Sequence, residues 1–222
     1  KENLKESLSD ISHQLKTPLT SIIIILDNIL DNPDMEQTVR EDFIKDIKRE
    51  ITNIQFLVAN LLKLSKLDAN SVQFINKEVK VEEIIQNVVK NVSSICDLKN
   101  IKINITGDLK AKIVCDERWQ IEAITNIVKN AAEHSKTDSE IDISYEQNKA
   151  YTKVAIKDYG AGISNSDIKH IFQRFYKSKN SAKDSIGIGL PLAKSIIERN
   201  NGYIEVTSEE GKGTTFTIKY LK

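Results

Sequence analysis

The first 68 residues of this chain contain no glycine, although the full chain of 222 residues has eight. A segment without glycine has no residue suited to tight turns or left-handed backbone. Apolar residues make up 40% of the chain and charged residues 29%, as in an ordinary water-soluble protein with enough material for a core. We therefore expect long helices at the N-terminus and a different architecture beyond it.

Other absences exclude several functional classes. Cys96 and Cys115 are the only cysteines and form no CxxC pair, so we expect reduced, buried thiols and no zinc site. Lys plus Arg and Asp plus Glu both number 32, which argues against nucleic acid as a partner. The longest aliphatic run, Ile22 to Leu26, is too short to span a bilayer. The sequence has no signal peptide. It begins at Lys1, and a regular pattern of apolar residues is already present from Leu4, so we expect a fragment of a longer protein.

The N-terminal segment carries a heptad pattern of apolar residues in alternating steps of four and three. Its members are Leu4, Leu8, Ile11, Leu15, Pro18, Ile22, Ile25 and Ile29. His13 stands two residues after Ile11, about 200° around the helix, and is predicted to face solvent. An exposed imidazole is an accessible nucleophile, although the same pattern also fits a surface histidine without a role.

A second apolar pattern runs from Val39 to Leu61, and Asp31 to Asp34, with Pro33, separates the two. We expect two helices joined by a turn, because proline disfavours helix at the preceding residue. A single hairpin leaves its apolar stripe uncovered. Pairing two copies into a four-helix bundle is the simplest way to bury it, so the hairpin predicts a homodimer.

Beyond a linker at residues 67–71 the pattern becomes mixed. Helical periodicity is predicted over 81–96, 117–133 and 190–200, and strands over 101–105, 141–145, 154–156, 203–207 and 215–220. The predicted fold class is α plus α/β: a helical hairpin at residues 1–68, then an α/β sandwich with a mixed or antiparallel sheet at residues 72–222.

Two glycine pairs in the second half follow predicted elements. Asp158 ends a strand and precedes Gly160 and Gly162; its carboxylate can accept a hydrogen bond from an exocyclic amine such as that of adenine. Gly187 and Gly189 stand before a predicted helix, where exposed N–H groups and the helix dipole favour an anion. Each pair alone fits a tight turn equally well.

Two further segments suggest a phosphate ligand. The polar stretch 177–185, which begins at Lys177, is predicted to be a mobile lid, although a solvated loop also fits. Asn126 and Asn130 are four residues apart on one helix face, and their carboxamide oxygens suit Mg²⁺.

The order of these segments, SHQLKTPLT, the asparagine helix, DYGAGI, IFQRFY, GIGL and GKGTTF, closely resembles the two-component sensor histidine kinases over essentially the whole chain. The resemblance implies ATP and Mg²⁺ as cofactors, autophosphorylation of His13, and transfer of the phosphoryl group to an aspartate of a response regulator. It implies catalytic roles for Gln14 beside His13 and for Thr17 in dephosphorylating the regulator, and Asn130 as the metal ligand. It places the nucleotide at Asn126, Asn130, Asp158, Gly160, Gly162, Phe175, Lys177, Gly187, Gly189 and Leu190.

Two departures from that pattern keep an alternative open. Gln14 stands where the family commonly has an acidic base, and Glu133-His134 where many members have Lys-Tyr. A degenerate kinase that dimerises, binds nucleotide and docks a regulator would fit these changes. An ATP-gated protein of the gyrase or heat-shock chaperone type lacks a histidine-bearing hairpin, so His13 argues against it.

The resemblance also implies where the fragment belongs. We expect a soluble, cytoplasmic portion of a membrane-anchored bacterial sensor, attached to the membrane only through an absent upstream segment.

Overall fold

The computed structural model describes residues 2–177 and 187–222, with side chains from Ser9 onward. The chain divides into two compact units, residues 1–62 and 63–222. None of the described helices is long and apolar enough to cross a membrane.

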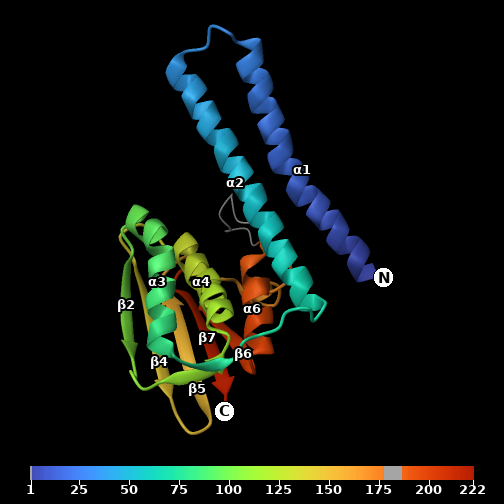
Figure 1. Cartoon of the computed structure of the whole chain (residues 1–222). Helices are drawn as coiled ribbons and strands as arrows, with labels where there is room; N and C mark the ends of the chain where they lie inside the picture. The colour runs from blue at the N-terminus through green and yellow to red at the C-terminus, as the bar shows by residue number, and fades with distance from the viewer. Residues whose placement is uncertain (1, 178–186) are drawn as a thin grey trace. The chain divides into compact units, whose positions relative to one another are not determined.

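The first unit is a helical hairpin (Figure 1). Helix α1 spans Glu2–Asp31 and α2 begins at Gln37; α2 ends at Asp68, so its last turns belong to the second unit. Arg40 donates a hydrogen bond at 2.8 Å to the carbonyl of Pro33 and so ties α2 to the connecting turn. The two predicted helices and their turn are confirmed.

The apolar heptad residues predicted from the sequence lie along one side of α1, which we call its inner seam. Its described members are all half-buried: Ile11, Leu15, Pro18, Ile22, Ile25 and Ile29. Pro18 lies inside α1, and its missing N–H leaves the carbonyl of Gln14, four residues earlier, without its usual helical donor.

The second unit is built on a five-stranded sheet in the order β2-β4-β5-β7-β6. Its strands are β2 (Lys102–Gly107), β4 (Glu140–Gln147), β5 (Tyr151–Asp158), β6 (Gly202–Glu209) and β7 (Gly213–Leu221). β2 pairs with β4 in parallel and the other neighbours are antiparallel, which confirms the predicted mixed sheet.

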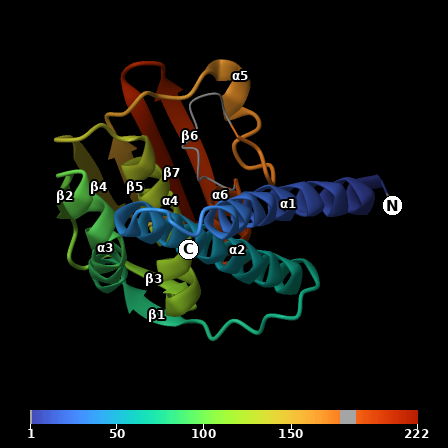
Figure 2. The same cartoon turned by 90° about the horizontal axis from the view of Figure 1, so that it is seen from above.

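Three helices cover one face of this sheet: α3 (Val81–Leu98), α4 (Glu117–His134) and α6 (Gly189–Arg199) (Figures 1 and 2). Alternate strand residues point into the resulting core, among them Ile143, Ile156, Phe216 and Ile218, which are all fully buried. Successive side chains of a strand point to opposite faces, so apolar residues at every second position make one face of each strand apolar.

The sequence patterns did not reveal three short elements. Strands β1 (Lys77–Lys80) and β3 (Lys112–Cys115) pair with each other in a separate two-stranded sheet, and α5 spans Asn165–Ile168. Four residues are too few to show a period. Cys96 and Cys115 are free and buried, as expected, and burial raises the pKa of Cys115 to about 12.

Candidate functional site

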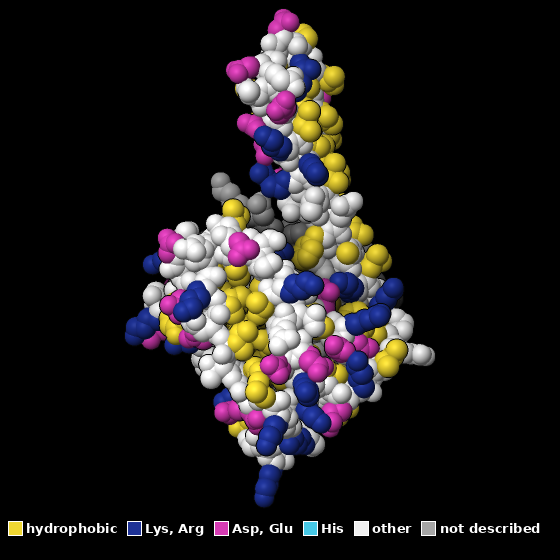
Figure 3. Space-filling view, turned by 60° about the vertical axis from the view of Figure 1, so that its left-hand side comes forward, with side chains coloured by type: hydrophobic (Ala, Val, Ile, Leu, Met, Phe, Trp, Pro, Cys, Tyr) yellow, Lys and Arg dark blue, Asp and Glu magenta, His cyan; other side chains and the backbone are white. Residues whose placement is uncertain are grey.

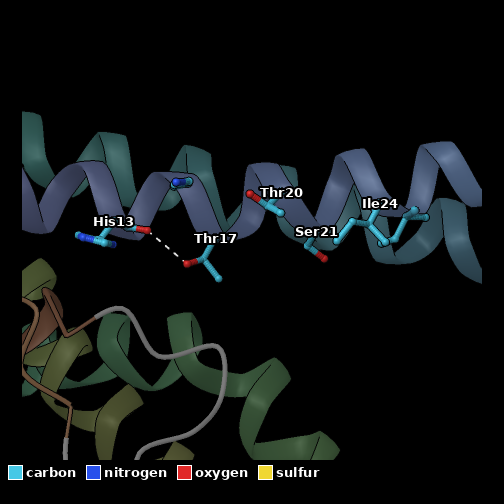
Figure 4. A pocket seen from close by; sticks show the side chains of 7 residues that line it. His13, Thr17, Thr20, Ser21 and Ile24 are labelled. Carbon is cyan, nitrogen blue, oxygen red and sulfur yellow. Dashed lines mark hydrogen bonds between the residues drawn. The ribbon is translucent and has the colours of Figure 1, made fainter.

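His13 lies on the exposed side of α1, away from the seam, as the heptads predicted. Figure 4 shows His13, Thr17, Thr20, Ser21 and Ile24 along one shallow recess of the helix, which Lys16 and Ile25 also line. The Thr17 hydroxyl donates a hydrogen bond at 3.3 Å to the backbone carbonyl of His13. The His13 side chain is exposed, and its imidazole has no hydrogen bond to any residue that the structure describes.

Gln14 is half-buried beside His13. Within residues 9–177 and 187–222, no side-chain hydrogen bond joins Gln14 to the His13 ring. The glutamine is therefore near the nucleophile but does not hold it in this conformation.

Asp158 is the last residue of β5 and is almost fully buried, at 3% exposure. Its Oδ1 accepts hydrogen bonds from the backbone N–H groups of Gly160 (2.9 Å) and Thr214 (3.3 Å). Oδ2 has no partner in the described part of the chain. Burial raises the pKa of Asp158, while hydrogen bonds from the backbone N–H groups of Gly160, Thr214 and Asp158 itself oppose that shift. One oxygen is thus held by the fold and the other is free to bind a donor such as an amine.

Gly160 and Gly162 allow the loop after Asp158 to pass close to other backbone. A Cβ on Gly160 would lie 2.3 Å from the carbonyl oxygen of His134, at the end of α4. Gly162 has a φ of +71°, which side chains rarely adopt. Packing within the protein is enough to require both glycines.

The two asparagines of α4 have different environments. Asn126 is buried; its Nδ2 donates to the carbonyl of Glu122 at 2.9 Å, and its Oδ1 faces Gly189 at the start of α6. Asn130 is half-buried, and its side chain has no hydrogen bond to a described residue. Asn126 therefore joins α4 to α6, while the Asn130 carboxamide is available to a ligand.

The segment before α6 is hydrogen-bonded to the IFQRFY segment, residues 171–176. Gly187 has a φ of +73°, and its carbonyl accepts a hydrogen bond at 2.9 Å from the N–H of Phe175, itself at φ +62°. Leu190 is half-buried in the first turn of α6, and Lys177 is exposed. The predicted lid at 177–185 lies, apart from Lys177, outside the described residues.

The end of α4 is held by a residue that no motif indicated. The ammonium of Lys99 donates to the carbonyls of Ala132 (2.9 Å), Glu133 (2.7 Å) and Ser135 (3.0 Å). A positive charge there is favourable because helix C-termini carry partial negative charge. Burial, followed by the charge of Lys99, lowers the pKa of the neighbouring His134, so that imidazole is neutral at pH 7.

Models of two known protein families match most of the chain. The "His Kinase A (phospho-acceptor) domain" family matches residues 3–70, and the "Histidine kinase-, DNA gyrase B-, and HSP90-like ATPase" family matches residues 115–222. The chain belongs to the two-component histidine kinases. This confirms the resemblance stated from the motifs.

Curated histidine kinase relatives align over nearly the whole chain. Heme sensor protein HssS of Staphylococcus saprophyticus is 33% identical over 216 residues, 97% of this chain and 46% of HssS. Sensor protein SrrB of Staphylococcus aureus is 30% identical over 223 residues, 98% of this chain and 38% of SrrB. The chain therefore spans less than half the length of either relative.

Solved histidine kinases share the fold. AdeS of Acinetobacter baumannii is 22% identical with a TM-score of 0.78, covering 94% of this chain and 97% of that one. ThkA, solved in complex with response regulator protein TrrA, is 21% identical with a TM-score of 0.81, covering 100% of this chain and 63% of the other.

Proposed function

We propose that this histidine kinase core transfers the γ-phosphoryl group of ATP to His13 and then passes it to an aspartate of a response regulator. The observation that best supports this proposal is the exposed His13 imidazole on the helical hairpin. The same chain joins that hairpin to an ATPase-type domain. We assign residues 1–68 to dimerisation and phosphotransfer and residues 72–222 to nucleotide binding.

The first step forms a bond between an unprotonated ring nitrogen of His13 and the γ-phosphorus, while the bond to the bridging oxygen of ADP breaks. The proton on the other ring nitrogen is then lost to water, since Gln14 has no group able to accept it. Phosphoryl transfer depends mainly on in-line positioning and charge neutralisation, so a strong base beside the histidine is not required.

Adenine recognition is proposed at Asp158. Its free Oδ2 can accept from the exocyclic amine of the base, while Gly160 and Thr214 hold Oδ1. We place the base against Gly160 and Gly162, the polyphosphate near Gly187, Gly189 and Leu190 at the α6 N-terminus, and Phe175 and Lys177 at the edge of the site. Asn126 supports this site from behind.

Asn130 fits Mg²⁺ as a hard oxygen donor whose side chain has no hydrogen bond to a described residue. No group of three or more His, Cys, Asp or Glu suited to a metal occurs among the described residues, so phosphate oxygens and water would supply the other ligands. Bound Mg²⁺ would neutralise charge on the polyphosphate.

The partner is proposed to be a response regulator that docks on the recess beside His13. Thr17 is one turn from His13, and its hydroxyl is already oriented along this face (Figure 4). By rotating away from the His13 carbonyl, Thr17 can position water for hydrolysis of the regulator's aspartyl phosphate.

The hairpin surface supports a homodimer. Besides the inner seam, α1 exposes a second heptad stripe whose members are 44 to 74% exposed: Leu19, Ile23, Leu26 and Leu30. On α2 the residues Ile44, Ile51, Val58 and Leu62 are 40 to 58% exposed. Figure 3 shows hydrophobic side chains in a row along one side of the hairpin. A second copy packed as a four-helix bundle would cover both stripes.

The test is incubation with γ-labelled ATP. We expect an acid-labile, base-stable label that is lost in His13→Ala, with unchanged folding and nucleotide affinity because His13 is exposed. Nucleotide binding without any label would favour the degenerate kinase, and a label retained in His13→Ala would place the acceptor elsewhere.

A further inference from the structure

Three polar side chains form a row across neighbouring strands of the second unit: Asp158 on β5, Thr214 on β7 and Ser208 on β6. Thr214 and Ser208 are direct partners in the antiparallel pairing of β7 with β6, and the Thr214 N–H donates to Asp158. Two positions back along β5 and β7 lie Ile156 and Phe216, which are fully buried, so the row lies on the same helix-covered face. This is the end of the sheet at which we place the adenine base.

The Ser208 hydroxyl takes part in three contacts. It accepts a hydrogen bond at 2.8 Å from the N–H of Ile163, in the loop after Asp158, and it donates at 2.9 Å to the carbonyl of Gly213. It also lies 2.9 Å from the hydroxyl oxygen of Thr214. A hydroxyl carries a single proton. Because that proton goes to the Gly213 carbonyl, Ser208 can only accept from Thr214.

This distribution of protons fixes the polarity of the Thr214 hydroxyl. Its proton points to Ser208, so the Thr214 oxygen offers only lone pairs to any other group. Thr214 is 5% exposed, and its side chain makes no other hydrogen bond to a described residue. The ionised carboxylate of Asp158 is likewise an acceptor only. Two acceptors and no side-chain donor therefore stand next to each other in the row.

We propose that Ser208 sets the base specificity of the nucleotide site by fixing the Thr214 hydroxyl as an acceptor. This inference rests on the proposed function, which places adenine at Asp158. The exocyclic amine of adenine has two N–H groups, and two acceptors can satisfy both, directly or through one water molecule. A base with a carbonyl oxygen at that position brings a further acceptor instead. Its oxygen is left without a donor in a buried site, so such a base binds more weakly.

Ser208 is a positioning residue, because it acts through Thr214 and not on the base itself. Without the Ser208 hydroxyl, the Thr214 proton can turn toward a carbonyl oxygen, and this source of discrimination is lost. The loop after Asp158 keeps a second connection to the β6–β7 turn, from the Gly211 N–H to the Ala161 carbonyl at 2.7 Å. Removing the hydroxyl of Ser208 is therefore expected to change base preference more than the fold.

The experiment compares the affinities of ATP–Mg²⁺ and ITP–Mg²⁺ for the full chain by calorimetry. ITP carries a carbonyl oxygen where ATP carries the amine. We expect the unmodified chain to prefer ATP, and Ser208→Ala to lower the ratio of the two affinities about fivefold, as for the loss of one hydrogen bond. Ser208→Thr keeps the hydroxyl and should hold the ratio within about twofold. The matched control is Ser144→Ala, which alters an exposed serine on the opposite face of β4 and should leave both affinities unchanged.

Thr214→Val gives a second test, because valine has nearly the shape of threonine but no hydroxyl. This variant should also lower the ratio, since the acceptor itself is removed, and it decides the question if Ser208→Ala does not fold. Adding Ser208→Ala to Thr214→Val should change the ratio no further, because both act through the same hydroxyl. An unchanged ratio in either single variant, an equal loss of both nucleotides, or additive effects in the double variant would overturn the role of Ser208.

The outcomes also separate this inference from the proposed function. An unmodified chain that binds neither nucleotide would contradict the proposed function. An unmodified chain that binds ATP and ITP equally would overturn the proposed selection and leave ATP binding intact. A preference for ATP that persists in Ser208→Ala would contradict the role of Ser208 alone.

Discussion

The hydroxyl of Thr17 donates a hydrogen bond to the backbone carbonyl of His13, one turn earlier on the same exposed face of α1. Hydrogen bonds of this kind from threonine to a carbonyl four residues earlier are local and easily exchanged for water. Thr17 is therefore anchored beside the nucleophile without being required for the helix.

Thr17→Ala is expected to leave autophosphorylation of His13 within about twofold, since exposed positions contribute little to stability. Dephosphorylation of a phosphorylated regulator should slow by at least tenfold, because alanine cannot hold a water molecule. Thr17→Ser should keep most of the phosphatase activity. Equal loss of both activities in Thr17→Ala would mean that the residue is only structural.

Gln14→Glu is expected to raise the autophosphorylation rate by about tenfold or less. A positioned base contributes roughly 10²- to 10⁴-fold in favourable cases, but a loose phosphoryl transfer needs less activation of its nucleophile. The ratio of the two rates should decline as the pH approaches about 4.3, the ordinary pKa of glutamate, because about half of the carboxylate is protonated there. Single-turnover rates from pH 4.5 to 8.5 test this, and a slower Glu variant at every pH would refute the argument.

Asp158→Asn is expected to weaken ATP binding while leaving the fold intact. The asparagine oxygen can still accept from Gly160 and Thr214, but its NH₂ group would then face the adenine amine, donor against donor. An unsatisfied buried group costs about 1–3 kcal/mol, which corresponds to roughly five- to 150-fold in affinity. GTP, which carries an acceptor at that position, should lose less. Calorimetry with both nucleotides measures the difference, and an equal loss would reject the contact.

Asn130→Ala is expected to lower the affinity for ATP–Mg²⁺ several-fold and to leave adenosine binding unchanged, because only the phosphate-bound metal involves this side chain. Asn126→Ala should instead lower the melting temperature, since it removes the bond to the Glu122 carbonyl and the contact with Gly189. If Asn130→Ala instead lowered the melting temperature, and Asn126→Ala lowered only the affinity for ATP–Mg²⁺, the two assignments would have to be exchanged.

The pH dependence of stability should contain a contribution from His134. Its pKa is lowered in the folded state, so the unfolded chain binds the proton more readily and stability falls as the pH drops below about 6.5. His134→Phe should remove this part of the slope between pH 8 and pH 5.5. Urea unfolding at several pH values measures it; identical slopes in the two proteins would show that His134 is not buried as a neutral group.

Several features of this protein follow from its sequence because their causes are local. The seven-residue repeat alone places Ile11 and Ile22 on the inner side of α1 and His13 on the outer side, and a helix makes no other arrangement possible. The absence of glycine before residue 68, the strand alternation around Ile143 and Ile156, and the order of the motifs predicted the hairpin, the mixed sheet and the family in the same way.

Other features were decided only by tertiary structure, because they join residues that no local pattern connects. Strands β1 and β3 exist through pairing with each other, and Trp119 packs at 5.7 Å against the ring of Phe74, which lies between α2 and β1. Lys99 reaches the end of α4 from 33 to 36 residues away, and Arg174 reaches Asp68 across 106. Periodicity and capping preferences act over a few residues, whereas these contacts depend on how helices and strands pack. The sequence therefore determined which chemistry the chain carries, and packing decided which asparagine and which aspartate oxygen lack a partner among the described residues, and which arginine reaches the end of α2.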